Sequence, residues 1–225
     1  MEPDFDSGIF GKLRKNAGLL WKSYIQHPFV EQLAAGTLPA QCFKKFLTQD
    51  YLFLIHFSRG YALLAAKSTK IEDIGDALEG LKAIAEEMPL HVAYAKKWGI
   101  SESEMGKTSE AVETIAYTRF VMDVGYSGDR LDLMAALVPC VAGYAEVGLG
   151  LARSKVTVFN GNPYAEWIEN YESDDYLKGV KAFLESFNKL AEEYNSDSRF
   201  QKLSAIFNMA TRLETEFWQM GLNAK

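Results

Sequence analysis

Apolar residues recur at three- and four-residue spacing along almost the whole chain, and this helical periodicity constrains the fold more than any other feature. No segment combines sustained period-two alternation with the Asn-Gly or Asp-Gly turns that are typical of β-hairpins. The most strand-like stretch is the short run 156–159, inside a loop expected at 154–162. The sequence therefore predicts an all-α protein with roughly eight or nine helices.

Proline, glycine and polar residues divide the periodic pattern into helices. We expect a first helix over 9–24, a short one over 28–35 that ends at Gly36, and a long one from Pro39 to about Lys67. Pro89 predicts a kink or a break in the next helix, and Ser173 is expected to cap a later one. The remaining apolar stripes run over 112–121, 133–152, 164–171, 177–194 and 200–221.

Length and charge exclude several classes of protein. A chain of 225 residues fits one domain, 1–225, with a substantial core. Its formal net charge of −6 opposes binding to nucleic acid or to an anionic membrane surface. The sequence shows neither a long uninterrupted apolar run nor a basic, apolar leader, so we expect a soluble, cytoplasmic protein. Its two cysteines, Cys42 and Cys140, are expected to be free thiols.

Polar residues interrupt three of the apolar stripes. Asp50 lies in the middle of the apolar face of the helix that begins at Pro39, and Glu214 occupies the same kind of position in the last helix. Cys140 and Tyr144 lie one turn apart on one side of the helix over 133–152. Burial of a carboxylate is costly unless it is paired or hydrogen-bonded, so this pattern indicates an enclosed polar pocket within a helical bundle.

Structural roles for the same residues remain open at this point. Each acid could cap a neighbouring helix or pair with a buried arginine, and Cys140 could pack as a small apolar residue. We interpret His27, which precedes Pro28, as a helix cap, and His56 and His91 as isolated histidines. We interpret Glu86 and Glu87 as a solvated pair. No metal-ligand spacing, phosphate loop or dinucleotide fingerprint is present, so neither a metal nor a cofactor is predicted.

Several motifs in register resemble the TenA family, the thiaminase II proteins. The opening motifs are HPFV at 27–30, GTLP at 36–39, QDY at 49–51 and HF at 56–57. The block LVPCVAGYAEVG at 137–148 is similar to the family's cysteine segment, and ETEFW at 214–218 to its C-terminal glutamate helix. Order and spacing agree from about Leu20 to Gly221. The variants QDYL at 49–52 and PCxxGY at 139–144 look closer to fungal or other eukaryotic members than to the best-known bacterial ones.

The resemblance implies a haem-oxygenase-like fold used without haem, assembled as a homotetramer. It implies hydrolysis at the aminopyrimidine methylene carbon, of thiamin or of aminomethyl-aminopyrimidine. Cys140 aligns with the nucleophile, Glu214 with the acid/base and Asp50 with the carboxylate that binds the pyrimidine. Tyr117, Tyr144 and Tyr171 match pocket tyrosines, and Phe53 stands where some relatives carry tyrosine.

Two functions of other classes are weighed against hydrolysis. A haem-binding protein would need a proximal histidine on an inward helical face near the N-terminus, and His27 beside Pro28 is badly placed for that role. A non-catalytic pyrimidine-binding or regulatory protein would not require a thiol together with two inward carboxylates. The small-molecule hydrolase is therefore the preferred interpretation, and the sequence does not rank thiamin against its breakdown products.

Overall fold

The computed structural model describes residues 2–194 and 196–224, in which every regular element is an α-helix. The all-α prediction is therefore confirmed for this part of the chain. The eleven helices are α1 (Gly8–Ala17), α2 (Leu19–Ile25), α3 (Pro28–Ala34), α4 (Ala40–Ala66), α5 (Ile71–Lys97), α6 (Glu102–Lys107), α7 (Val112–Ser127), α8 (Arg130–Arg153), α9 (Ala165–Glu172), α10 (Asp174–Glu192) and α11 (Asp197–Leu222).

Local chemistry explains why the described residues form more helices than the eight or nine expected. The first expected helix is divided into α1 and α2 because Gly18 adopts φ +52°, a left-handed conformation that glycine adopts without steric cost. The short helix α6 was not predicted, although Ser101 and Glu104 form a reciprocal capping box at its start. His27 caps α3 by accepting from the Phe29 N–H at 3.1 Å, as predicted.

Of the kink or break predicted at Pro89, the break does not occur: α5 continues through this residue to Lys97. The strand-like run 156–159 forms no strand and lies in a loop. Side-chain hydrogen bonds hold this loop: Asn162 Nδ2 donates to the Leu33, Ala34 and Val158 carbonyls at 2.8–3.2 Å. The predicted cap at Ser173 is present, with its hydroxyl accepting from the Tyr176 N–H at 3.3 Å.

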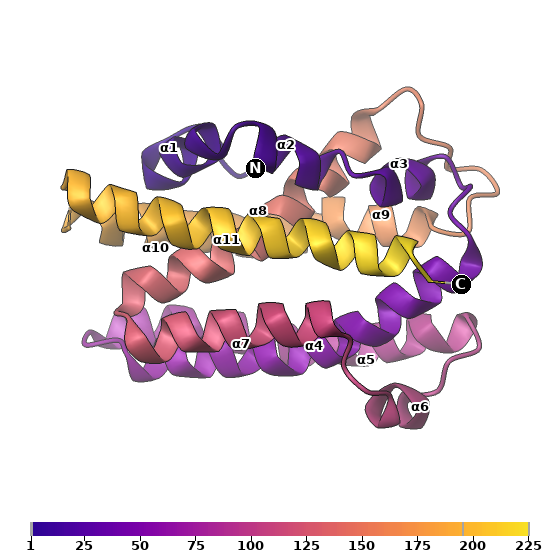
Figure 1. The fold of residues 1–225 in the computed structure, drawn as a ribbon, viewed down its shortest axis with the longest axis horizontal. Coiled ribbons are helices and arrows are strands. Elements are labelled where there is room, and N and C mark those ends of the chain that lie inside the picture. Colours follow the sequence, from indigo (N-terminus) through magenta and orange to yellow (C-terminus); the bar gives the residue numbers. More distant parts are fainter. Residues whose placement is uncertain (1, 195, 225) are drawn as a thin grey trace.

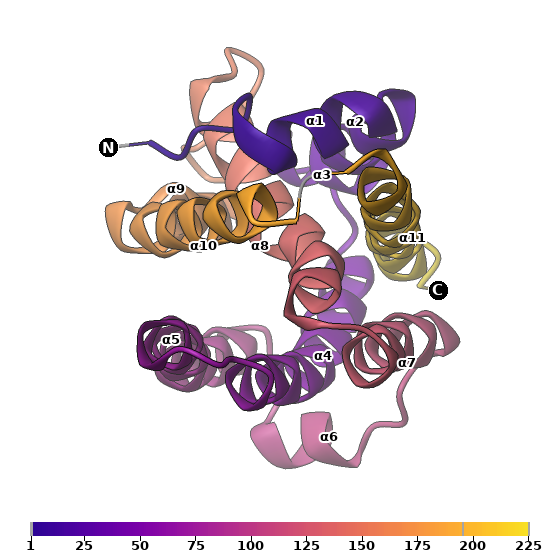
Figure 2. The ribbon, with the colours of Figure 1, turned by 90° about the vertical axis from the view of Figure 1, so that its left-hand side faces the viewer.

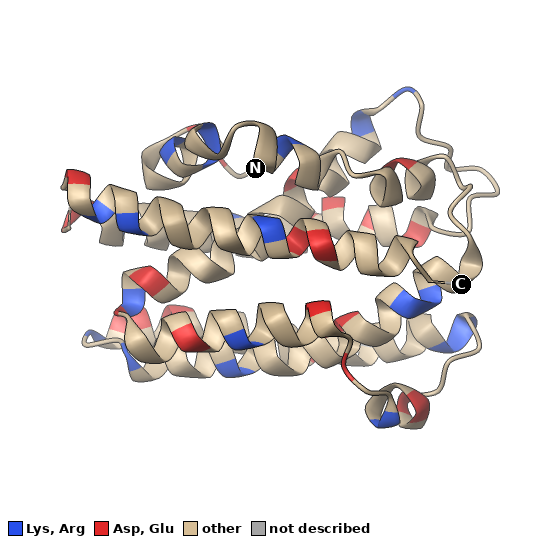
Figure 3. Cartoon of the chain, viewed as in Figure 1, with Lys and Arg blue, Asp and Glu red and all other residues tan. Residues whose placement is uncertain are grey.

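Helix α8 lies in the centre of the molecule and the other long helices surround it (Figures 1 and 2). It is long and apolar enough to span a bilayer by length and composition alone, but 78% of its most apolar window is buried within the protein. Such burial is typical of a core helix in a folded bundle. Charged residues of both signs are interspersed along the surrounding helices (Figure 3).

The inward faces of α4 and α11 meet α8 in a core that is rich in aromatic rings. Trp218 of α11 stacks on Phe29 with ring centroids 5.1 Å apart, and it also contacts Phe46 and Tyr144 at the same separation. Asp50 and Glu214 lie on these two inward faces and are 4% and 2% exposed. The helical periodicity therefore predicted their burial correctly.

Candidate active site

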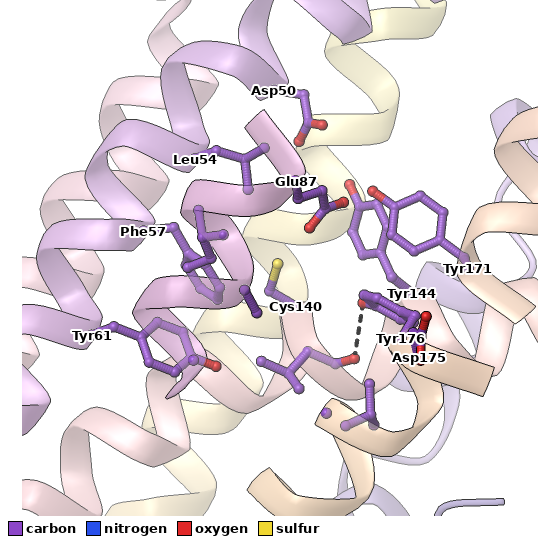
Figure 4. Close-up of a pocket in the computed structure, with 16 residues that line it drawn as sticks. Asp50, Leu54, Phe57, Tyr61, Glu87, Cys140, Tyr144, Tyr171, Asp175 and Tyr176 are labelled. Atoms are coloured by element: carbon purple, nitrogen blue, oxygen red, sulfur yellow. Dashed lines mark hydrogen bonds between the residues drawn. The ribbon is translucent and has the colours of Figure 1, made fainter. Parts of the chain in front are cut away.

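A cavity of about 150 Å3 lies among α4, α5, α8, α9 and α10 (Figure 4). Asp50 and Phe57 line it from α4, Cys140 and Tyr144 from α8, and Tyr171 from α9. Cys140 and Tyr144 both reach the cavity because residues four apart lie on the same side of a helix. The structure thus brings together four of the seven site residues that the sequence singled out.

Cys140 is half-buried and free, and its sulfur points into the cavity (Figure 4). Burial raises the pKa of the thiol well above its usual value, and the charges of Glu214 and Asp50 raise it further. The resting residue is therefore a neutral thiol at pH 7. To act as a nucleophile it must transfer its proton to a neighbouring base during the attack.

Asp50 lies on the cavity wall next to His91 of α5. His91 Nδ1 is 3.5 Å from Asp50 Oδ2, an oxygen that is fully buried and accepts no hydrogen bond from the described residues. Burial raises the pKa of Asp50 to about 6, although the charge of His91 opposes the rise. A buried acceptor without a donor is costly, so Asp50 is suited to receive a hydrogen bond from a ligand.

Glu214 does not line the cavity itself but lies next to Cys140, which does. Tyr117 Oη donates to Glu214 Oε1 at 2.8 Å, and the Cys140 thiol also interacts with this carboxyl group by hydrogen bonding. Burial raises the pKa of Glu214 to about 8 in spite of both donors. Neither Asp50 nor Glu214 pairs with an arginine or caps a helix in the described residues, so the structural roles left open for the two acids do not apply.

The aromatic site residues occupy three different places. Tyr144 and Tyr171 line the cavity, with their ring centroids 5.0 Å apart. Tyr117 does not line it and instead donates a hydrogen bond to Glu214. Phe53 does not line the cavity. The centroid of its ring lies 4.9 Å from that of Tyr117 and 5.7 Å from that of Phe217, so Phe53 packs against Tyr117.

Sequence reasoning missed Glu87 and His91. His91 Nε2 lies 3.1 Å from Glu87 Oε1 while Nδ1 faces Asp50, and Glu87 lines the cavity. The interpretation of Glu86 and Glu87 as a solvated pair is therefore wrong for Glu87, and His91 is not isolated. Burial lowers the pKa of His91, but the hydrogen bond to Glu87 and the charge of Asp50 outweigh it and leave the pKa raised. The i, i+4 spacing of Glu87 and His91 was the available signal.

Within 2–194 and 196–224, no three His, Cys, Asp or Glu side chains are placed to hold a metal ion. The site instead combines a thiol with two carboxyl groups whose pKa values differ. Such a pair supplies an ionised group for binding and a protonated group for acid catalysis at one pH.

Comparison with known proteins identifies the family. The model of the TENA/THI-4/PQQC family matches residues 14–224, nearly the whole chain. The chain belongs to this family. Among solved structures, the TenA family transcription regulator from Silicibacter sp. TM1040 is 43% identical, with a TM-score of 0.89 over 96% of both chains.

Two curated relatives are bacterial proteins of similar length. The aminopyrimidine aminohydrolase of Halalkalibacterium halodurans is 35% identical over 95% of both chains. An uncharacterized protein of Haemophilus influenzae is 39% identical over 94% of this chain and 98% of its own length. The chain also has the expected haem-oxygenase-like fold: a Shewanella denitrificans domain described by that fold superposes with a TM-score of 0.71 at 13% identity, covering 92% of this chain and 89% of that one.

Proposed function

We propose that this protein is a hydrolase that acts at the methylene carbon attached to an aminopyrimidine ring. The observation that carries the proposal is that the Cys140 thiol lines one cavity with Asp50, whose pKa is about 6, and hydrogen-bonds with Glu214, whose pKa is about 8. The relationship to an aminopyrimidine aminohydrolase at 35% identity supports it.

Recognition of the pyrimidine follows from the groups on the cavity wall. An aminopyrimidine presents an exocyclic amine and ring nitrogens in a fixed pattern of donors and acceptors. Asp50 is mostly ionised at pH 7, and its Oδ2 accepts no hydrogen bond from the described residues, so it can accept one from the amine. The rings of Phe57, Tyr144 and Tyr171 supply flat apolar contacts for the heterocycle.

The same arrangement supports a covalent route. Glu214 donates its proton to a ring nitrogen, and Cys140 Sγ adds to the activated ring while the thiol proton passes to the Glu214 carboxylate. That proton then leaves with the amine as its bond to the methylene carbon breaks, which releases ammonia from aminomethyl-aminopyrimidine. Water adds at the methylene carbon and gives up one proton, which passes to the sulfur as the sulfur–carbon bond breaks, and the ring proton returns to Glu214. The product is hydroxymethylpyrimidine.

Turnover of aminomethyl-aminopyrimidine and thiamin by purified protein tests the proposal. We expect hydroxymethylpyrimidine from the wild type and a loss of roughly a thousandfold or more in Cys140→Ser, because serine is a much weaker nucleophile at neutral pH. Cys42→Ser is the matched control, since Cys42 is buried elsewhere with its Sγ 3.4 Å from the Leu222 carbonyl. Turnover of Cys140→Ser within about tenfold of wild type would show that the thiol is not the nucleophile. Tight binding of hydroxymethylpyrimidine by a wild type that turns over neither compound would favour a regulatory protein.

A further inference from the structure

The helix that carries the proposed nucleophile, α8, contains a proline directly before the reactive cysteine. Pro139 has no N–H, so it cannot donate the helical hydrogen bond to the Ala135 carbonyl. A proline inside a helix weakens the helix locally and lets it bend at that point. The segment around Cys140 therefore depends on contacts from outside α8 to keep its orientation.

Two tyrosine hydroxyls make such contacts on the residues that flank Cys140. Tyr24 Oη of α2 donates to the Pro139 carbonyl at 3.3 Å. Tyr176 Oη of α10 donates to the Val141 carbonyl at 3.3 Å, the bond that Figure 4 draws as a dashed line. Successive residues of an α-helix are turned by about 100°, so Pro139 and Val141 lie to either side of Cys140 around the axis. The two bonds thus hold α8 on both sides of the thiol.

The position of Tyr24 is fixed by the packing around it. A Cβ on Gly143 would lie 2.1 Å from Tyr24 Cε1 and 2.5 Å from Tyr24 Oη, so the missing side chain is what lets this ring reach α8. The ring is fully buried, and its centroid lies 5.5 Å from that of Trp21 and 6.3 Å from that of Trp218. Close packing on all these sides keeps the hydroxyl on the Pro139 carbonyl.

Both hydroxyls are suited to holding a backbone carbonyl and not to transferring a proton. Burial raises the pKa of Tyr24 and that of Tyr176 well above the usual value, and the charge of Cys140 raises both further. The two phenols therefore stay protonated and remain donors when the thiol loses its proton. Tyr24 does not line the cavity, so its hydroxyl can influence a reaction there only through α8.

We propose that Tyr24 and Tyr176 are positioning residues for Cys140, whose hydroxyls fix the rotation of α8 and thereby hold the thiol toward the cavity and beside Glu214. The inference rests on the proposed hydrolase function. Without these bonds α8 turns more freely at Pro139, and the thiol faces the cavity for less of the time. Displacement of a reacting group by about 1 Å can cost about 100-fold in rate, so the loss of a hydroxyl from a residue that touches no substrate should be visible in kcat.

Tyrosine-to-phenylalanine variants test the proposal, because each removes one hydroxyl and keeps the ring. We expect Tyr24→Phe and Tyr176→Phe each to lower kcat on aminomethyl-aminopyrimidine roughly tenfold or more. Affinity for hydroxymethylpyrimidine should stay within about threefold of wild type, since Asp50 is unchanged. Tyr164→Phe is the matched control: its buried hydroxyl also donates to a backbone carbonyl, that of Leu38, and it does not line the cavity. This control should leave kcat unchanged, and melting temperatures report what each lost bond costs in stability.

Alkylation of the thiol supplies a second readout that needs no turnover. In a Cys42→Ser background, iodoacetamide can modify only Cys140, and mass spectrometry follows the rate. The rate should fall about threefold or more in Tyr24→Phe and Tyr176→Phe and stay unchanged in Tyr164→Phe.

The outcomes separate this proposal from the proposed function. An alkylation rate at or above that of wild type in Tyr24→Phe and Tyr176→Phe would overturn the positioning role. So would an unchanged kcat in both variants, or an equal loss of kcat in all three. If the wild type hydrolyses neither aminomethyl-aminopyrimidine nor thiamin while alkylation still slows in Tyr24→Phe and Tyr176→Phe alone, the proposed function fails and the positioning of the thiol stands.

Discussion

Asp50 and Glu214 are both buried, yet their surroundings give the two carboxyl groups different pKa values. Burial raises both, but the charge of His91 opposes the rise at Asp50, whereas Glu214 has only neutral donors in Tyr117 and Cys140. The pKa values of about 6 and about 8 leave Asp50 mostly ionised and Glu214 mostly protonated at pH 7. The two residues thereby hold opposite protonation states within one site.

The pH dependence of hydrolysis should reflect this difference. We expect kcat/KM to rise as Asp50 ionises near pH 6 and to fall as Glu214 loses its proton near pH 8, which gives a bell-shaped profile. Because the two acids interact, the apparent pKa values of the acidic and alkaline limbs of this profile belong to the pair rather than to either residue alone. Initial rates from about pH 5 to 9 measure the profile, and a rate that rises steadily through pH 8 would contradict the acid role of Glu214.

Neutral amides at the two acids should cause different defects. Asp50→Asn should weaken hydroxymethylpyrimidine binding roughly ten- to a hundredfold, since a charge-assisted hydrogen bond contributes ~1.5 to 3 kcal/mol. Glu214→Gln keeps the shape but cannot transfer a proton, so it should lower kcat by ~100-fold or more while the product still binds. Calorimetry beside steady-state kinetics separates the two effects. The exposed Glu216→Gln is the matched control, and normal binding and turnover in both site variants would leave the acids without a functional role.

At the scale of helices, α5 and α4 meet where His91 Nδ1 lies 3.5 Å from Asp50 Oδ2. The charge of His91 lowers the pKa of Asp50, so His91→Gln should raise that pKa and move the acidic limb of the pH profile to higher pH. The alkaline limb should move less, because His91 is not among the groups that shift the pKa of Glu214. His56→Gln is the control, because His56 lies beside Glu110 and Arg119 instead of Asp50. An unchanged acidic limb in His91→Gln would show that the histidine charge does not act on Asp50.

The close approach of α8 and α9 positions Tyr171. A Cβ on Gly148 would lie 2.7 Å from the Tyr171 backbone, whereas one on Gly150 would meet nothing within 4 Å. Gly148→Ala should therefore displace α9 and destabilise the protein by about 1–3 kcal/mol. Gly150→Ala should stabilise it by about 0.5–1 kcal/mol, because alanine suits a helix better than glycine. Thermal unfolding measures both changes, and equal melting temperatures would show that the two helices can separate freely.

At the scale of the whole molecule, large apolar side chains remain exposed on several helices. Leu19, Val112 and Tyr126 are 83%, 76% and 72% exposed. Burial of such residues between subunits is typical of homo-oligomers, and the homotetramer implied by the family resemblance stays a prediction. Light scattering should give a mass near 100 kDa, about four times the 25.2 kDa chain. A monomer at micromolar concentration would contradict it.

The sequence by itself determined the features that depend on local spacing. Helical periodicity predicted the all-α fold, the inward positions of Asp50 and Glu214, and the shared face of Cys140 and Tyr144. These predictions hold because residues three or four apart lie on one side of a helix wherever that helix packs. The resemblance then brought in Tyr117 and Tyr171, which periodicity alone did not separate from other core tyrosines.

Only the tertiary structure decided which of these side chains meet and what each one does. It placed Glu87 and His91 beside Asp50 and brought Tyr117 into a hydrogen bond with Glu214. It also placed Phe53 outside the lining of the cavity. These contacts join residues on different helices, so the spacing within any one helix does not encode them. The pKa values of the two acids have the same origin, because burial and neighbouring charge exist only after the helices have packed.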